Sequence, residues 1–191
     1  MEYLDIDSIN AAESGPIALR NYLTYLCLKD EKVKRTILEN SKKIKEDFKN
    51  IKDNLEINRE IRSIEFARKM KEYGFLAEMQ FVDFKGLEKY KKSFPMFACL
   101  RNSDVKDLYV LIYDITSYGV VVKDEKYNDR VINLDSFKKA YFNRLIEVKD
   151  YSLFFKKYIS KKKMDSFAHG NDLDAEDIFE GVLAIIALFG S

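Results

Sequence analysis

Few residues of this chain have the types and the spacing that catalysis or metal binding requires. The single histidine, His169, lies between Ala168 and Gly170, in a segment whose composition indicates a loop. The two cysteines, Cys27 and Cys99, lie in apolar runs, as buried free thiols do. This set does not have the spacing of a zinc site, and the chain has no phosphate-binding glycine loop and no Gly-x-Ser-x-Gly motif. The sequence therefore predicts no metal and no cofactor.

Composition and charge indicate a globular protein of a reducing compartment. The 191 residues are 47% hydrophobic and 34% charged, which is enough for a domain with its own core. Because 33 Lys and Arg balance 32 Asp and Glu, the net charge is +1, and we expect no nucleic-acid partner. Two cysteines do not suggest a disulfide framework, so we expect a cytoplasmic location. The acidic start, residues 1–10, does not have the pattern of a signal peptide.

The longest apolar run, Val182 to Phe189, is shorter than the roughly 20 residues that span a bilayer. We interpret it as a buried terminal helix, with an oligomer contact or a truncated membrane segment as the alternatives. Two prolines and seven glycines leave little room for linkers. We therefore expect an α+β domain over residues 1–150 and a helical C-terminal extension over residues 151–191 that packs on the same domain.

The hydrophobic period changes along the chain from helical to strand-like. The first third predicts a helix that begins at Ser14-Gly15-Pro16, then helices over 31–54 and 58–73, the last ended by Gly74. Strand-like segments follow at 75–82, 94–100, 107–115, 118–123, 130–134 and 145–148. Short helices are expected at 87–92 and 135–142, and tail helices at 151–162 and 172–189. Helices segregated from strands predict an α+β fold with an antiparallel sheet of about five strands.

Several segments match a known family in their order and residue types. They are a small and aliphatic helix start, a helix that ends in glycine and a hydrophobic residue, an apolar-proline strand start, an aromatic and aliphatic strand, and the start of a phenylalanine-bearing helix. In this chain they are Glu13–Leu19, Ala67–Phe75, Phe94–Phe97, Leu108–Ile112 and Leu134–Phe137. Over about residues 8–148 the chain resembles the bacteriocin-processing peptidase domain, a papain-like cysteine peptidase fold. That domain lies at the N-terminus of exporters that remove double-glycine leader peptides.

The departures from this family fall at its catalytic positions. Ser14 stands in the place of the nucleophilic cysteine, and Leu108 stands in the place of the histidine. Ser8 replaces the glutamine that helps to form the oxyanion hole, and Glu125 replaces the proline that follows the aspartate. Of the catalytic set that the resemblance implies, only Asp124 is present.

Acyl transfer by this set would need a base that it does not contain. A serine hydroxyl is a poor nucleophile unless a base takes its proton, and Leu108 cannot do so. Losing a triad member costs on the order of 10⁴ to 10⁶ in rate. His169 would supply a base only if its loop folded back to Ser14, and we interpret it as an exposed loop residue. We therefore expect a pseudo-peptidase with no catalytic residue, and not an enzyme.

The same positions could instead recognise a ligand. Strand alternation places Tyr109 and Tyr113 on one face, and if that face is open their rings suit contact with a peptide. The resemblance implies a groove beside Ser14, Leu108 and Asp124, so these five residues are the candidate peptide-binding site. For Asp124 the alternative is a turn or capping role, and for Ser14 it is a helix cap.

Three functions are consistent with the sequence. Degenerate members of the resembled family dock the exported polypeptide in type I secretion. The first hypothesis is therefore a non-catalytic domain that binds a peptide or polypeptide partner, such as a secretion substrate, and meets a membrane only through a transporter. The second is a small interaction protein of the immunity or antitoxin type, which balanced charge and lysine-rich helices fit equally well. The third is a serine or cysteine hydrolase with an atypical base. The partner's identity and the oligomeric state stay open.

Overall fold

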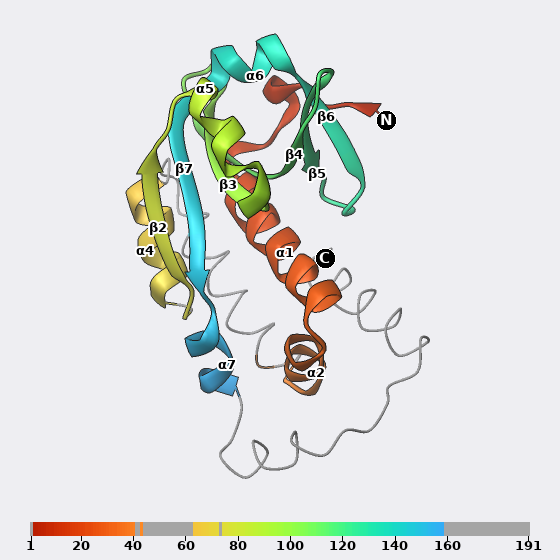
Figure 1. The fold of residues 1–191 in the computed structure, drawn as a ribbon, viewed down its shortest axis with the longest axis vertical. Coiled ribbons are helices and arrows are strands. Elements are labelled where there is room, and N and C mark those ends of the chain that lie inside the picture. Colours follow the sequence, from red (N-terminus) through yellow and green to blue (C-terminus); the bar gives the residue numbers. More distant parts are fainter. Residues whose placement is uncertain (1, 41–42, 44–62, 73, 159–191) are drawn as a thin grey trace.

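A seven-stranded mixed sheet is the centre of the fold (Figure 1). The computed structural model describes residues 2–40, 43, 63–72 and 74–158, and these confirm the predicted α+β class. The strands are β1 (Glu2–Tyr3), β2 (Leu76–Phe81), β3 (Met96–Arg101), β4 (Asp107–Ile115), β5 (Gly119–Lys123), β6 (Asp129–Asn133) and β7 (Tyr141–Asp150). Their order is β1-β6-β5-β4-β3-β7-β2, so β1 and β2 are the edges. Only β1 and β6 pair in parallel, and every other neighbouring pair is antiparallel.

The six predicted strand segments each overlap one of β2 to β7, but the expected sheet of about five antiparallel strands is wrong. Glu2–Tyr3 adds a parallel strand beside β6, and two residues are too short for an alternating pattern to be seen. Strand β7 begins at Tyr141, where the sequence predicted a helix up to residue 142. This longer β7 lies between β3 and β2 and pairs with both.

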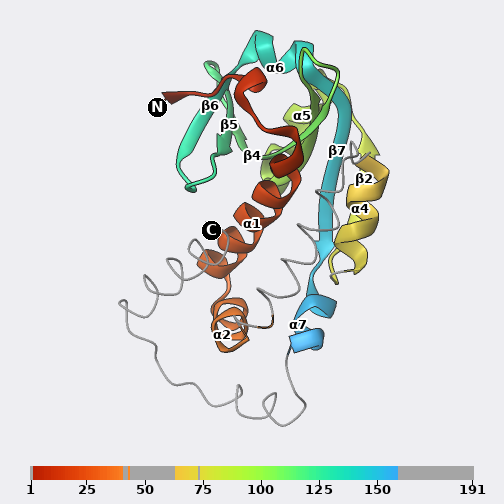
Figure 2. The same ribbon diagram turned by 180° about the vertical axis from the view of Figure 1, so that it is seen from behind.

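Helices and short 3-10 turns cover both faces of the sheet. One core contains residues of α1 (Ala11–Lys29), α2 (Glu31–Glu39), α4 (Ser63–Glu72) and α7 (Ser152–Tyr158). The other core contains residues of η1 (Ile6–Ser8), α5 (Phe84–Leu87) and α6 (Leu134–Ala140), and η2 (Glu88–Ser93) packs against it. Figure 2 shows α4 alongside β2, at the opposite side of the sheet from β6. Because successive side chains of a strand point to opposite faces of the sheet, they enter different cores.

Helix α1 begins three residues before the predicted start. Asn10 caps it, since its side-chain oxygen accepts a hydrogen bond from the Ala12 nitrogen at 3.1 Å. Ser14 is therefore a residue of the first helical turn, and the prediction that it caps the helix is wrong. Pro16 lies inside the helix, where it removes one backbone hydrogen bond.

Gly74 follows α4 as predicted and turns the chain back into β2. Its φ is +92°, in the left-handed region. The Phe75 N–H bonds the Met70 carbonyl at 3.0 Å, and the Gly74 N–H bonds the Lys71 carbonyl at 2.9 Å. This pair of bonds is the Schellman arrangement that closes a helix C-terminus. The reversal lays β2 along α4.

The first part of the C-terminal extension packs on the domain. Phe154 of α7 is fully buried, its ring stacks on Phe75 with 4.9 Å between centroids, and its N–H bonds the Gly74 carbonyl at 3.1 Å. His169, the helix predicted over 172–189 and most of the one predicted over 31–54 fall outside the described residues. None of the helices in the described ranges has the length and apolar content to cross a membrane.

Candidate functional site

Ser14 fastens the start of α1 to strand β4. Its buried hydroxyl donates to the Ala11 carbonyl at 3.0 Å and accepts from the Tyr109 N–H at 3.1 Å. Pairing of β4 with β5 ends at Ile112, which lies opposite Val122. Tyr109 is three residues before Ile112 in β4, so it has no partner in β5, and its N–H donates to the Ser14 oxygen. The Ser14 hydroxyl is thus engaged with backbone on both sides.

We expect Ser14→Ala to lower the free energy of unfolding by about 1 to 3 kcal/mol, because the buried Tyr109 N–H loses its acceptor. Urea unfolding followed by circular dichroism measures this change. Ser136→Ala, at an exposed position of α6, is the matched control and should change the value by less than about 0.5 kcal/mol. Equal stability of the two variants would contradict the structural role of the Ser14 hydroxyl.

Leu108 and Tyr109 lie on opposite faces of the sheet. Leu108 is fully buried in the core beneath α6, whereas Tyr109 belongs to the core beneath α1. The Tyr109 ring stacks on Phe66 of α4 with 4.4 Å between centroids and 14° between planes. The predicted open groove is therefore wrong at these residues, because α1 and α4 cover one face and Leu108 points to the other.

Tyr113 shares a face with Tyr109, as predicted, but that face is covered here too. Its hydroxyl lies 3.1 Å from the Asn21 carbonyl oxygen and 3.2 Å from the Tyr127 hydroxyl. The Lys123 ammonium lies over both tyrosine rings, 5.5 Å from the centroid of Tyr113 and 4.6 Å from that of Tyr127. Burial raises the pKa of both phenols. Tyr113 thus joins α1 to the sheet and offers little ring surface to a ligand.

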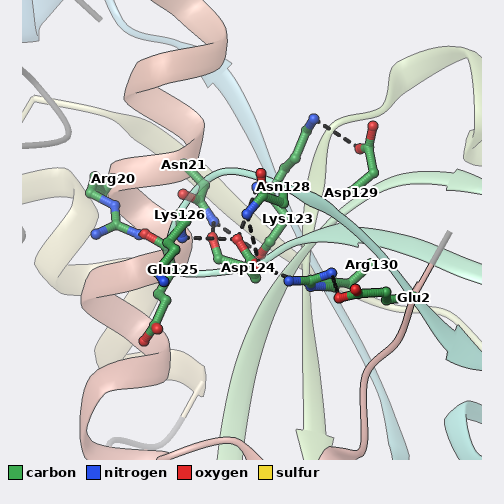
Figure 3. Close-up of polar contacts among 10 residues, drawn as sticks. All are labelled: Glu2, Arg20, Asn21, Lys123, Asp124, Glu125, Lys126, Asn128, Asp129 and Arg130. Carbon is green, nitrogen blue, oxygen red and sulfur yellow. Dashed lines mark hydrogen bonds and ion pairs between the residues drawn. The ribbon is translucent and has the colours of Figure 1, made fainter. Parts of the chain in front are cut away.

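Asp124 organises the turn between β5 and β6 (Figure 3). One carboxylate oxygen accepts from the Lys126 and Asn128 N–H groups, both at 2.8 Å, and the other accepts from Arg130 Nε at 2.8 Å. Burial raises the pKa of this carboxyl, but the hydrogen bonds from Asn128 and Lys126 and the Arg130 charge outweigh burial, so its pKa lies below the ordinary value. These contacts are those of a turn residue.

Helix α1 docks on the same turn through two polar side chains. The Asn21 amide donates to the Lys123 and Asp124 carbonyls, both at 3.1 Å, and the Arg20 guanidinium donates to the Glu125 carbonyl (Figure 3). Asn21 is seven residues after Ser14, which separates the two by about 10 Å along the helix axis. The structure therefore does not bring Ser14, Leu108 and Asp124 together in one groove.

The two thiols are buried, as predicted. Burial raises the pKa of Cys27 and of Cys99 to about 12, so both are protonated at neutral pH. Across the part of the chain that the structure describes, no three His, Cys, Asp or Glu residues are grouped so that they could hold a metal ion.

A groove that the sequence did not reveal lies between α4 and the edge strand β2. Its volume is about 460 Å³, and it is lined by Ala67, Arg68, Lys71, Ala77, Glu78 and Met79. Three of these residues are consecutive in β2. Because neighbouring side chains of a strand point to opposite faces, a groove lined by three in a row runs along the backbone edge of the strand.

Exposed apolar side chains stand at both ends of β2. Leu76 is 43% exposed and Phe81 is 75% exposed. Exposed rings also lie at the other edge of the sheet, where Tyr3 and Tyr118 line a hollow of about 450 Å³. The sequence predicted β2 as a strand, but nothing in its pattern indicated that its outer side is open.

Comparison with known proteins adds no assignment. No protein-family model matches the chain, and no curated protein matches it.

Proposed function

We propose that this chain binds an extended peptide or polypeptide segment by adding it as a further strand along β2. The observation that carries the proposal is the groove at the outer edge of β2, beside α4. Among the described strands, β2 pairs with β7 alone, so the N–H and C=O groups of its other side have no strand partner. An edge of this kind is a template for an incoming chain.

Strand β2 has two of the features by which proteins protect a sheet edge, a register shift between Leu76 and Ala77 and the exposed charge of Glu78, but it does not have the others. Edge strands are commonly very short, carry proline or lysine, or are twisted away. Strand β2 has six residues with the sequence LAEMQF, without proline or lysine. Strand β1, at the opposite edge, has only two residues. The exposed Leu76 and Phe81 give an incoming segment apolar surface at both ends of the strand.

We also propose that the fold of this chain is related to the papain-like fold of the bacteriocin-processing peptidase domain and that its catalytic function has been lost. A nucleophile and its base must be within hydrogen-bond reach, so this relation implies that the first helix starts against the strand at position 108. The Ser14 hydroxyl lies 3.1 Å from the Tyr109 nitrogen, which supports the relation. Leu108 points to the opposite core, so a histidine at that position could not have reached Ser14, and this placement counts against the relation. Binding of a polypeptide, such as a secretion substrate, is then the function we propose.

Strand addition is tested with peptides selected from a displayed random library on the full chain. Two N-methylated forms of a selected peptide are then compared, each methylated at one of the two alternating sets of residues. In an added strand only one set points its N–H groups at β2. We expect that methylating this set weakens binding by roughly a hundredfold and that methylating the other changes it little.

Variants of the chain locate the bound peptide. Leu76→Ser combined with Phe81→Ser should weaken binding about tenfold, because the peptide loses two apolar contacts. Tyr118→Ser, which removes an equally exposed ring at the other end of the sheet, is the control and should bind as the unchanged chain does. Equal effects of both methylation sets, or binding lost only in Tyr118→Ser, would refute strand addition along β2.

A further inference from the structure

We infer that the segment bound along β2 carries acidic side chains toward α4, an inference that rests on the strand addition proposed above. Arg68 and Lys71 line the groove from α4, and both side chains are exposed. Ala67, Ala77 and Met79 supply its small and apolar remainder. We call Arg68 and Lys71 the cationic rim; two exposed cations beside small and apolar residues suit a carboxylate.

The one acidic residue that lines the groove directs its side chain to the other face. Ala77 belongs to the core beneath α4, and Met79 packs against the same core. Glu78 lies between them, so alternation turns its side chain away from α4. It pairs in register with Glu147 of β7. Among the described residues that line the groove, the charged side chains on the side facing α4 are thus those of Arg68 and Lys71.

The spacing of the two cations fits the repeat of a strand. Arg68 and Lys71 are three residues apart on a helix, which places their Cβ atoms about 5 to 6 Å apart. Side chains at alternate positions of an added strand share one face and are about 6.8 Å apart. Glutamate or aspartate at two alternate positions can therefore each reach one cation. Since both cations are exposed, these pairs contribute selectivity that salt weakens.

The test uses three labelled, end-blocked peptides of alternating valine and a second residue, which is glutamate, glutamine or lysine. Fluorescence anisotropy measures their binding at ionic strengths of about 0.02 M and 0.3 M. We expect the glutamate peptide to bind roughly tenfold tighter than the lysine peptide at low salt, and this ratio to fall to about threefold or less at high salt. The double variant Arg68→Glu/Lys71→Glu should reverse the order.

A matched control carries the same charge change elsewhere. Lys89→Glu/Lys92→Glu alters two exposed lysines with the same three-residue spacing in η2, and the preference for glutamate should persist in it. Equal affinity for all three peptides, combined with the alternating effect of N-methylation, would overturn the acidic preference and leave strand addition in place. If methylating either of the two alternating sets of N–H groups changes binding equally for every peptide, strand addition is refuted. The charge preference, which rests on it, is then refuted too.

Discussion

Gly74→Ala is expected to lower the free energy of unfolding by about 3 kcal/mol or more, through backbone strain and a steric clash together. Gly74 has φ +92°, a conformation that costs an L-residue of the alanine type at least about 1 kcal/mol. A Cβ at this position would lie 2.5 Å from the Phe154 nitrogen and 2.7 Å from the Leu153 carbonyl carbon. Backbone of α7 would have to move away, which would also weaken the stacking of Phe154 on Phe75.

Urea unfolding of the full chain measures this loss. Gly74→Asn separates the two causes, because asparagine tolerates positive φ but also has a Cβ. We expect it to be almost as destabilised as Gly74→Ala, since the steric clash is the larger effect. Leu153→Ala, at an exposed position of α7, is the control and should change stability by less than about 0.5 kcal/mol. A change below 1 kcal/mol in Gly74→Ala would contradict the close approach of α7.

The same glycine bears on the proposed function. It joins α4 to β2, and these two elements form the sides of the groove. A shift of this turn would change the distance between the cationic rim and the strand edge. We therefore expect Gly74→Ala, under conditions where it is folded, to bind the selected peptides less tightly than Leu153→Ala does.

Asp124→Asn is expected to cost about 2 kcal/mol at neutral pH. An asparagine oxygen can still accept from the Lys126 and Asn128 N–H groups. Its amide NH₂, however, would replace the oxygen that accepts from Arg130 at 2.8 Å. The guanidinium of Arg130, which is only partly exposed, would then face a donor. The turn that receives Asn21 and Arg20 of α1 would be loosened.

The cost of this substitution should depend on pH in a defined direction. The folded-state pKa of Asp124 lies below its ordinary value, so ionisation of the carboxyl stabilises the folded chain above the unfolded pKa of about 3.9. This contribution is lost as the pH falls through the folded pKa. The difference between the unchanged chain and Asp124→Asn should therefore be largest at neutral pH and shrink below about pH 4.

Unfolding in urea at several pH values measures the pH dependence. Asp135→Asn is the control, since Asp135 is exposed and forms an ion pair with Lys138 at 3.7 Å. An exposed pair of this kind is worth about 0.5 kcal/mol or less. A difference between Asp124→Asn and the unchanged chain that stays constant from neutral pH to about pH 2.5 would show that the Asp124 carboxylate does not stabilise the fold through its charge.

Local patterns of the sequence predicted most of the elements. Six strand segments and the end of α4 at Gly74 follow from alternation and from the one residue type that favours positive φ. Alternation also placed Tyr109 and Tyr113 on one face correctly. By the same rule Leu108 must point the other way, but the resemblance had assigned it to the groove. A two-residue strand and a capping asparagine four residues before a more prominent serine are too small to appear in such patterns.

The sequence by itself determined the α+β class, the segments that become strands and the burial of both cysteines, because hydrophobic period and residue type act over a few neighbouring residues. Only the tertiary structure decided which strands are edges and which faces are covered. Strand β7 enters between β3 and β2 and leaves β2 at the edge, while α1 and α4 close the face that carries Tyr109. These outcomes depend on pairing and packing between segments far apart in the chain, and no local pattern records which partner a strand or helix will meet.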